Sequence, residues 1–332
     1  LSMRENGRTW LVPFLEVSVA QRHFLILAHS GRPASILAAT EVSKQLVDAG
    51  AVPVATDSQM PALHAETNVP IAQLGSEVEP KDIELVICLG GDGTILKAAE
   101  ITREHSVPIL GINMGHVGFL AELEPEEMPA TVAKIIAKDY QVEERMTIDV
   151  SVELEGKNVF NTWALNEASV EKLSRERMIE VVVAVDDRPI STFGCDGVLL
   201  ATPTGSTAYS FSAGGPVVWP SVAALVLVPL SAHALFARPL VTDPSSTLTI
   251  DLLERTGASG VLWCDGRRTH TLAPGSRVRA KPFLPPGRSR QQRVPARSGW
   301  SDRFQPHHRG EAKPRLRRWR CSGGRSVVAS RR

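Results

Sequence analysis

The hydrophobic period of the sequence changes near residue 140, and this change constrains the fold more than any other feature. Before residue 140, uniformly apolar runs alternate with segments whose apolar residues recur at helical spacing. The apolar runs cover residues 23–30, 83–91 and 107–113, and the helical segments cover 34–50, 94–105 and 124–140. Apolar strands that alternate with helices are typical of a parallel sheet covered on both faces. We therefore expect an α/β domain with a parallel, Rossmann-like sheet over residues 23–145.

After residue 140, short runs alternate between apolar and polar residues and are separated by turn residues. The runs with this pattern cover residues 146–156, 159–173, 178–192, 246–254, 260–267 and 276–281. Alternation with a period of two predicts strands, and the short turns between them favour antiparallel pairing. We expect a second, mostly antiparallel β domain over residues 146–281.

Charge is distributed unevenly along the chain. The formal net charge is +1, but residues 277–332 carry 15 Arg and 2 Lys against 2 acidic residues, a net charge of +15 that leaves −14 on the rest. Residues 282–332 are rich in Arg, Pro, Gly and Ser without a sustained period, so we expect a basic, disordered tail. Its composition is typical of a GC-rich gene read out of frame; the alternative is an extension that binds nucleic acid. We expect residues 1–22 to be an irregular N-terminal extension.

The cysteines indicate the compartment. The four cysteines are far apart and form no CxxC or other metal-ligand spacing; they are Cys88, Cys195, Cys264 and Cys321. This spacing favours a reduced, cytoplasmic protein. No apolar run approaches the roughly 20 residues that span a bilayer, and the first residues lack a convincing signal-peptide core. We expect no association with a membrane.

The segment LVICLGGDGTILKAAE, residues 85–100, places a glycine-rich turn between a strand and a helix. A helix start presents backbone N–H groups and a positive dipole, and open α/β sheets bind ligands at the carboxyl ends of their strands. The turn therefore suits a phosphate, beside which Asp92 would accept a proton from an attacking hydroxyl or recruit a metal ion. The alternative is that Asp92 only caps the helix. The segment matches neither a Walker A loop nor a GxGxxG fingerprint.

Three other clusters suit a ligand with sugar hydroxyls. Asn166 and Glu167 are adjacent in a strand-like run, where an amide and a carboxylate suit a ribose diol; the alternative is a solvated edge strand. Residues 202–212 offer seven side-chain hydroxyls and suit a nucleoside, although ordinary turns are also rich in such residues. The glycines of residues 111–122 again follow a strand and fit either a ligand-binding turn or a close-packed one.

In their order and spacing, these segments resemble the NAD kinase family over about residues 23–280. The motifs that carry the resemblance are GGDGT (90–94), GINMGHVGFLAE (111–122), NEASVEK (166–172), DGVLLATPTGSTAYSFSAGGP (196–216) and VPLSAHALFARPLV (228–241). GGDGT is shared with diacylglycerol kinase-like and phosphofructokinase-like enzymes, whereas the last three motifs are specific. The resemblance implies an α/β domain, a β domain and a site between them. It also implies a homodimer or homotetramer in which a neighbouring subunit contributes to the site.

The resemblance assigns roles to individual residues. It implies that Asp92 is the catalytic proton acceptor and that the phosphate donor lies against Gly90, Gly91, Gly93 and Thr94. Asn166 and Glu167 would bind the adenosine ribose, and Asp196 would reach a dinucleotide in a partner subunit. The residues implied to bind NAD are Asp92, Gly93, Lys97, Asn166, Glu167, Arg177, Gly194, Asp196, Thr207, Ala208, Tyr209, Ser210, Phe211 and Ser212. No protein ligand is assigned to a metal ion.

The implied reaction transfers a terminal phosphoryl group from ATP or polyphosphate to the 2′-hydroxyl of the adenosine ribose of NAD, giving NADP. A divalent cation, Mg²⁺ by expectation, would offset the charge of the donor. The alternatives are a related GGDGT kinase of a lipid or sugar, and a non-catalytic dinucleotide sensor whose basic tail binds nucleic acid. The tail departs from the family, whose members continue with an apolar segment that returns to the N-terminal domain. We expect this departure to affect stability and oligomerisation more than the site.

Overall fold

Five parallel strands form the first sheet, in the order β5-β4-β3-β6-β7. The computed structural model describes residues 2–5, 8–11, 21–105, 107–114, 120, 127–234, 237–283 and 292–296. The strands of this sheet are β3 (His23–Ala28), β4 (Val52–Ala55), β5 (Ala72–Gln73), β6 (Ile83–Leu89) and β7 (Ile109–Ile112). Because β6 ends at Leu89, the glycine-rich turn lies at the carboxyl edge of the sheet.

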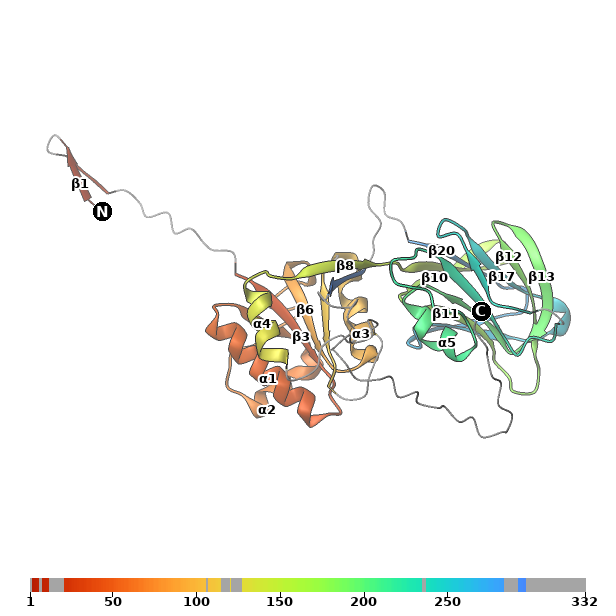
Figure 1. The fold of residues 1–332 in the computed structure, drawn as a ribbon, viewed down its shortest axis with the longest axis horizontal. Helices are drawn as coiled ribbons and strands as arrows, with labels where there is room; N and C mark the ends of the chain where they lie inside the picture. Colours follow the sequence, from red (N-terminus) through yellow and green to blue (C-terminus); the bar gives the residue numbers. More distant parts are fainter. Residues whose placement is uncertain are drawn as a thin grey trace, which may run out of the picture. The chain divides into compact units, whose positions relative to one another are not determined.

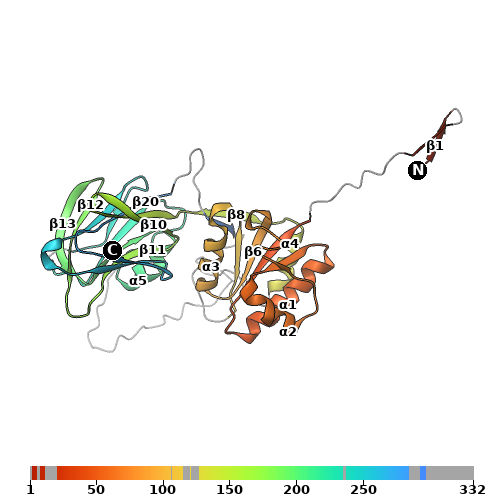
Figure 2. The ribbon, with the colours of Figure 1, turned by 180° about the vertical axis from the view of Figure 1, so that it is seen from behind.

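Helices cover both faces of this sheet. They are α1 (Pro33–Asp48), α2 (Met60–Glu66), α3 (Asp92–Thr102) and α4 (Met128–Ile136), with short 3-10 turns η1 (Asp57–Gln59), η2 (Pro80–Asp82) and η3 (Arg103–His105). Phe24 and Ile26 pack with α1, α2 and α4, whereas Leu25 and Leu27 pack with α3 on the other face. Figure 1 and Figure 2 both show α1, α2 and α4 together on one side of the strands. Burial on both faces explains the uniformly apolar strands.

Two six-stranded antiparallel sheets form the second part, in the orders β10-β9-β20-β17-β12-β13 and β16-β15-β14-β11-β18-β19. The strands are β9 (Ile148–Leu154), β10 (Lys157–Ala164), β11 (Glu167–Lys172), β12 (Ile179–Val185), β13 (Arg188–Cys195), β14 (Gly197–Ala201), β15 (Leu225–Leu230), β16 (Leu240–Thr242), β17 (Leu248–Leu252), β18 (Gly260–Cys264), β19 (Arg268–Leu272) and β20 (Arg277–Pro282). Alternate residues of both sheets, such as Val181 and Leu200, belong to one buried core. The predicted combination of a parallel α/β part and an antiparallel β part is confirmed.

The two parts share apolar contacts. Trp163 on β10 and Leu165 before β11 lie in the same buried cluster as Ile95 and Ala99 of α3. Residues 1–297 accordingly group into one unit by their contacts and do not separate near residue 145. The connection between β14 and β15 holds η5 (Gly205–Thr207) and α5 (Tyr209–Ser212), and η6 (Glu254–Thr256) follows β17. None of the helices in the described ranges is both long and apolar enough to cross a membrane.

The N-terminal extension was expected to be irregular, but it contains one pair of strands. Within residues 1–22, β1 (Ser2–Glu5) pairs antiparallel with β2 (Arg8–Leu11). The two strands are joined in sequence by Asn6-Gly7, a residue pair that strongly favours hairpin turns. The prediction overlooked this local signal.

The basic tail also differs from the expectation of disorder over residues 282–332. Its segment β21 (Gln292–Ala296) pairs antiparallel with β8 (Gln141–Arg145), over five residues of each strand. The pairing satisfies backbone groups that an open strand edge would leave exposed. Residues 284–291 and 297–332 lie outside the described residues.

Candidate active site

The glycine-rich turn joins β6 directly to α3. Gly91 is the N-cap residue in an extended conformation, with φ −96° and ψ −167°, and no side chain caps the helix. A Cβ atom at Gly90 would lie 2.4 Å from the Thr94 hydroxyl, whereas a Cβ atom at Gly91 or Gly93 would meet no described atom within 4 Å. The turn is therefore tightly packed at Gly90 and open at the other two glycines. Because the first N–H groups of a helix lack helical partners, this open end suits an anion.

Asp92 is the first residue of α3 and not its N-cap, so the interpretation of Asp92 as only a capping residue is wrong. The residue is half-buried, and its Oδ1 accepts a hydrogen bond of 3.0 Å from the Leu120 backbone amide. This bond connects the carboxylate to the segment after β7. The other glycine cluster, residues 111–122, falls largely outside the described residues. Asp92 thus places a carboxylate at the open end of the helix.

Asn166 and Glu167 lie at the start of β11. This strand pairs with β14 on one side and β18 on the other, so the alternative of a solvated edge strand is wrong. Both residues are buried, with exposed fractions of 6% and 8%. Asn166 Oδ1 and Glu167 Oε2 nevertheless lack a hydrogen-bond partner among the described residues. Buried oxygens without partners are costly, which points to a ligand that supplies the missing hydrogen-bond partners.

The hydroxyl-rich loop packs directly against this pair. Thr202 donates its backbone amide to the Asn166 carbonyl at 2.9 Å and its hydroxyl to the Leu165 carbonyl at 2.6 Å. A Cβ atom at Gly205 would lie 1.9 Å from the Asn166 carbonyl oxygen, so only glycine fits there. Ser210 Oγ is a further buried oxygen that has no partner in the described chain. The loop therefore adds a third buried oxygen without a partner among the described residues.

The other predicted residues of this loop, and Lys97, lie closer to the surface. Thr207, the last residue of η5, and Ala208, which follows it, are half-buried, whereas Tyr209, Phe211 and Ser212 are exposed. Lys97 is half-buried on α3, five residues beyond Asp92. Figure 1 and Figure 2 show α5 beside β11. The Tyr209 backbone amide donates a hydrogen bond to the Glu167 carboxyl, and the Tyr209 side chain is exposed.

The environment of Glu167 changes its ionisation. Burial raises the pKa of its carboxyl to about 8, and the charges of Asp265 and Glu171 act in the same direction. A hydrogen bond from the Tyr209 backbone amide lowers the pKa by less. The carboxyl group of the free protein therefore keeps its proton at neutral pH, and it can both donate and accept hydrogen bonds.

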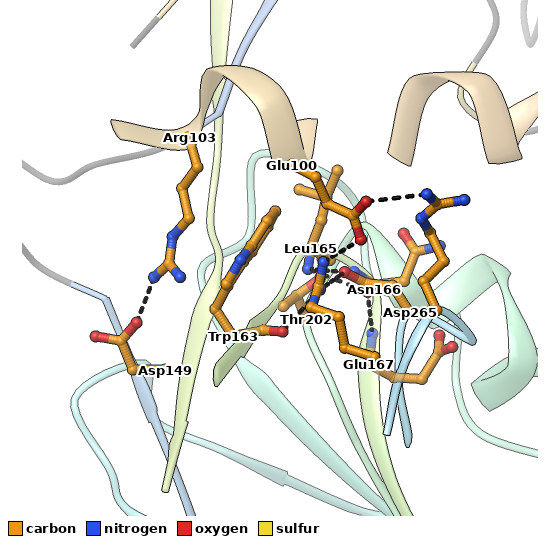
Figure 3. A network of polar contacts seen from close by, with 11 residues as sticks. Glu100, Arg103, Asp149, Trp163, Leu165, Asn166, Glu167, Thr202 and Asp265 are labelled. Carbon is orange, nitrogen blue, oxygen red and sulfur yellow. Dashed lines mark hydrogen bonds and ion pairs between the residues drawn. The ribbon is translucent and has the colours of Figure 1, made fainter. Parts of the chain in front are cut away.

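The sequence analysis missed Asp265, which holds the backbone of the pair (Figure 3). Its carboxylate accepts hydrogen bonds from the amides of Leu165 at 2.9 Å and Asn166 at 2.7 Å, and from Arg268 at 2.8 Å. Burial raises the pKa of the Asp265 carboxyl, and these donors act against that rise. Asp265 has φ 54°, and Gly266 after it has φ 62°. The sequence signal for a turn at this position was the Asp265-Gly266 pair between two strands. The sequence analysis took this pair as part of the strand-like run 260–267.

The remaining predicted residues are Asp196, Gly194 and Arg177. Asp196 forms an ion pair of 2.5 Å with Lys172, at the opposite end of β11 from Glu167. The hydrogen bond from the Lys172 ammonium lowers the pKa of the Asp196 carboxyl below its usual range. Gly194 lies on β13 two residues before Asp196, and Arg177 is exposed after β11. Five residues of extended strand cover about 17 Å, which separates Asp196 from Glu167 along β11.

The described residues form no complete metal cage. Among them, no group of three or more His, Cys, Asp or Glu side chains is placed to hold a metal ion. Mg²⁺ commonly keeps several waters and binds one or two carboxylates together with substrate phosphates. Asp92 at the open helix end fits such a shared site.

Comparison with known protein families gives two matches that together span most of the folded chain. Residues 24–140 match the ATP-NAD kinase N-terminal domain, and residues 165–281 match the ATP-NAD kinase C-terminal domain. The NAD kinase of Leifsonia xyli subsp. xyli is 58% identical over 261 residues, which cover 78% of this chain and 86% of that protein. NAD kinase 2 of Streptomyces coelicolor is 51% identical over 263 residues, with the same two coverages.

Solved structures share the fold at lower sequence identity. Yeast NADH kinase complexed with NADH superposes with a TM-score of 0.75 at 22% identity, covering 85% of each chain. An NAD kinase from Archaeoglobus fulgidus in complex with ATP gives a TM-score of 0.57 at 24% identity, covering 79% of this chain and 90% of the other. Both therefore have the same arrangement of an α/β part and a β part.

Proposed function

The chain belongs to the NAD kinase family, and we propose that it transfers the terminal phosphoryl group of ATP to the 2′-hydroxyl of the adenosine ribose of NAD, giving NADP. The observation that carries this proposal is the buried pair Asn166 and Glu167, whose side-chain oxygens lack partners in the described chain. Relatives up to 58% identical are NAD kinases, and a ribose diol can supply the hydrogen-bond partners that these oxygens lack.

The acceptor ribose would bind at this pair. Each ribose hydroxyl can donate one hydrogen bond and accept others. Asn166 Oδ1 would accept from one hydroxyl, while the Glu167 carboxyl, with its pKa raised to about 8, would donate through one oxygen and accept through the other. Ser210 Oγ provides a further polar contact, and the exposed Tyr209 ring provides a flat surface for the adenine base.

The phosphate donor would bind at the start of α3. The space beside Gly91 and Gly93 lets phosphate oxygens approach the helix N–H groups, and Thr94 adds a hydroxyl close to Gly90. Asp92 would accept the proton of the ribose 2′-hydroxyl. At the same time the 2′-oxygen would bond to the terminal phosphorus of ATP, and the bond between that phosphorus and the oxygen of the leaving ADP would break. Positioning and electrostatic stabilisation supply most of the catalysis in such a transfer.

A divalent cation, Mg²⁺ in our proposal, fits the donor set of this turn. Asp92 is the residue that would contact it, and the remaining ligands would be phosphate oxygens and water. When bound, the cation neutralises negative charge on the donor phosphates. Lys97 on α3 would contact NAD beside this turn.

The residues at the far end of β11 suggest a role for a second subunit. We propose that Asp196, Gly194 and Arg177 contact the dinucleotide bound to a partner in a homodimer or homotetramer; the position of Asp196 at the opposite end of β11 from Glu167 supports this. Thr207, Ala208, Phe211 and Ser212 would line the nucleoside pocket. We also propose a cytoplasmic location, supported by the free, buried thiols of Cys88, Cys195 and Cys264.

The proposed function is tested by incubating the purified chain with NAD, Mg²⁺ and either ATP or inorganic polyphosphate. We expect ADP release from ATP that depends on NAD, with one NADP formed for each ADP. NADP formed with polyphosphate would add a second donor. ADP release with a glycerolipid or a sugar, and none with NAD, would reject the proposal.

A further inference from the structure

A chain of charged side chains connects α3 to the backbone of the ribose-binding pair (Figure 3). Glu100, near the end of α3, accepts a hydrogen bond of 2.5 Å from Arg268. Arg268 also donates to the Asp265 carboxylate at 2.8 Å. Asp265 accepts from the backbone amide of Asn166 at 2.7 Å and from that of Glu167 at 3.3 Å. These contacts run without a gap from the helix to the pair.

The contacts are largely shielded from water. The side chains of Glu100, Arg268 and Asp265 are 25%, 22% and 1% exposed. The Arg268 guanidinium lies 4.3 Å from the centre of the Trp163 ring and also donates to the Trp163 carbonyl. Glu100 also pairs with Arg267 at 3.0 Å, so each charge of this group faces more than one partner. These side chains therefore have one strongly preferred arrangement.

A second contact holds the same end of α3. Arg103 follows Glu100 by three residues, on the same side of the helix end, and its guanidinium lies 4.5 Å from the centre of the Trp163 ring. Arg103 also forms an ion pair with Asp149 on β9. The end of α3 is thus fixed to β-sheet residues at two points, which limits both sliding and rotation of the helix.

The helix itself connects these contacts to the phosphate turn. Asp92 and Glu100 belong to one continuous helix and are eight residues apart, about 12 Å along the axis. A helix of this length moves as a rigid body, so a displacement at Glu100 is carried to Asp92. The donor and acceptor halves of the proposed site are therefore linked by Glu100, in addition to the apolar contacts of α3 with Trp163 and Leu165.

We infer that Glu100, Arg268 and Asp265 hold the Asn166–Glu167 pair at a fixed distance from the phosphate turn, and that Glu100 is a positioning residue for phosphoryl transfer. The inference rests on the proposed function, because it takes the pair as the acceptor site and the turn as the donor site. Reacting atoms must approach to about 3–3.5 Å before transfer. A shift between the halves therefore lowers kcat, while each half still binds its own substrate.

The test compares Glu100→Gln with the control Glu104→Gln in the full chain. Glu104 is an exposed glutamate of η3, four residues further along, and lies outside the contacts described above. The measurements are kcat with ATP and NAD, and the Kd for NAD by calorimetry without ATP. We expect Glu100→Gln to lower kcat at least about tenfold with an NAD Kd within about threefold, and Glu104→Gln to leave both within about twofold.

Three results would overturn the inference. The first is a kcat of folded Glu100→Gln within about twofold of the wild type, and the second is an equal loss of kcat and NAD binding, which indicates a merely structural role. If Glu100→Gln does not fold, Glu100→Asp replaces it, because it keeps the charge on a shorter side chain. A reduced kcat of Glu100→Asp with unchanged NAD binding supports the inference. An unchanged kcat of Glu100→Asp is the third contrary result. Wild-type protein without NAD-dependent turnover would instead reject the proposed function.

Discussion

The carboxyl group of Glu167 titrates in a different range from that of an ordinary glutamate, because burial raises its pKa to about 8. In the unfolded chain the same group ionises near its ordinary value of 4.5. Between these values the unfolded chain loses a proton that the folded protein keeps. A raised folded pKa stabilises the protein fully below the unfolded pKa, and the contribution is lost as pH rises through the folded pKa.

This residue therefore predicts a pH-dependent stability. Glutamine at position 167 has a similar shape and does not titrate, so the free energy of unfolding of the wild type should fall relative to Glu167→Gln as pH rises from 5 to 9. The expected change is about 2–4 kcal/mol, from roughly 1.4 kcal/mol per pKa unit. Urea unfolding at several pH values measures it. If the free energy of unfolding of the wild type and of Glu167→Gln changed with pH in parallel, the raised pKa of Glu167 would be contradicted. Exposed Glu176→Gln serves as the control and should follow the wild type.

At the scale of elements, two loops use glycine for opposite reasons. Gly205 brings the loop after β14 against the backbone of Asn166, where a Cβ atom would lie 1.9 Å from a carbonyl oxygen. Gly91 leaves open space at the start of α3, where a Cβ atom would meet no described atom within 4 Å. The first glycine is needed by the fold, and we propose that the second leaves room for the phosphate donor.

The two glycines therefore predict different outcomes for the same substitution. Gly205→Ala should lower the free energy of unfolding by about 2–3 kcal/mol or more, because the added methyl group displaces the loop from the pair. Gly91→Ala should lower that free energy by less than about 1 kcal/mol, because alanine is a poorer N-cap than glycine, yet raise the KM for ATP by occupying the space for phosphate. Denaturant unfolding and steady-state kinetics of both variants measure this. Equal stability losses in the two variants would refute the distinction.

The sequence pattern predicts long elements with uniform burial better than short ones. The apolar run 83–91 corresponds to β6. Both faces of this strand are covered, so its sequence is apolar throughout and predicts a buried strand without ambiguity. The pattern failed for β4, α2 and β5, which are short and lie near Pro53, Pro61 and Pro70. Two to seven residues contain too few periods to distinguish a strand from a turn.

At the scale of the whole molecule, the contacts that complete the site connect residues far apart in the sequence. Asp265 and Asn166 are 99 residues apart, and Glu100 and Arg268 are 168 residues apart. Sequence reasoning identified Asn166 and Glu167 through their chemistry and their resemblance to a family. It could not identify Asp265, because an Asp-Gly pair in a turn has the same local pattern whether or not its carboxylate holds a distant backbone.

The pairing of β8 with β21 gives a prediction for the tail. A chain that ends at residue 297 keeps β21, whereas a chain that ends at residue 283 exposes the edge of β8. We expect the first to keep the Tm and kcat of the full chain, and the second to lose about 3–5 °C in Tm and to aggregate more readily. Thermal unfolding and light scattering measure both. If the 297-residue chain lost DNA binding present in the full chain, the tail would instead be a nucleic-acid-binding extension.

The central claim is that Asp92, at the open start of α3, accepts the proton of the attacking ribose hydroxyl. Its most direct test is the rate of NADP formation from NAD and ATP by Asp92→Asn, which keeps the size of the side chain. The control is Asp82→Asn, an exposed aspartate of η2 just before β6. We predict a loss of about 10²–10⁴-fold in kcat for Asp92→Asn, little change in the KM for NAD, and normal kinetics for Asp82→Asn. Normal turnover by Asp92→Asn would contradict the claim.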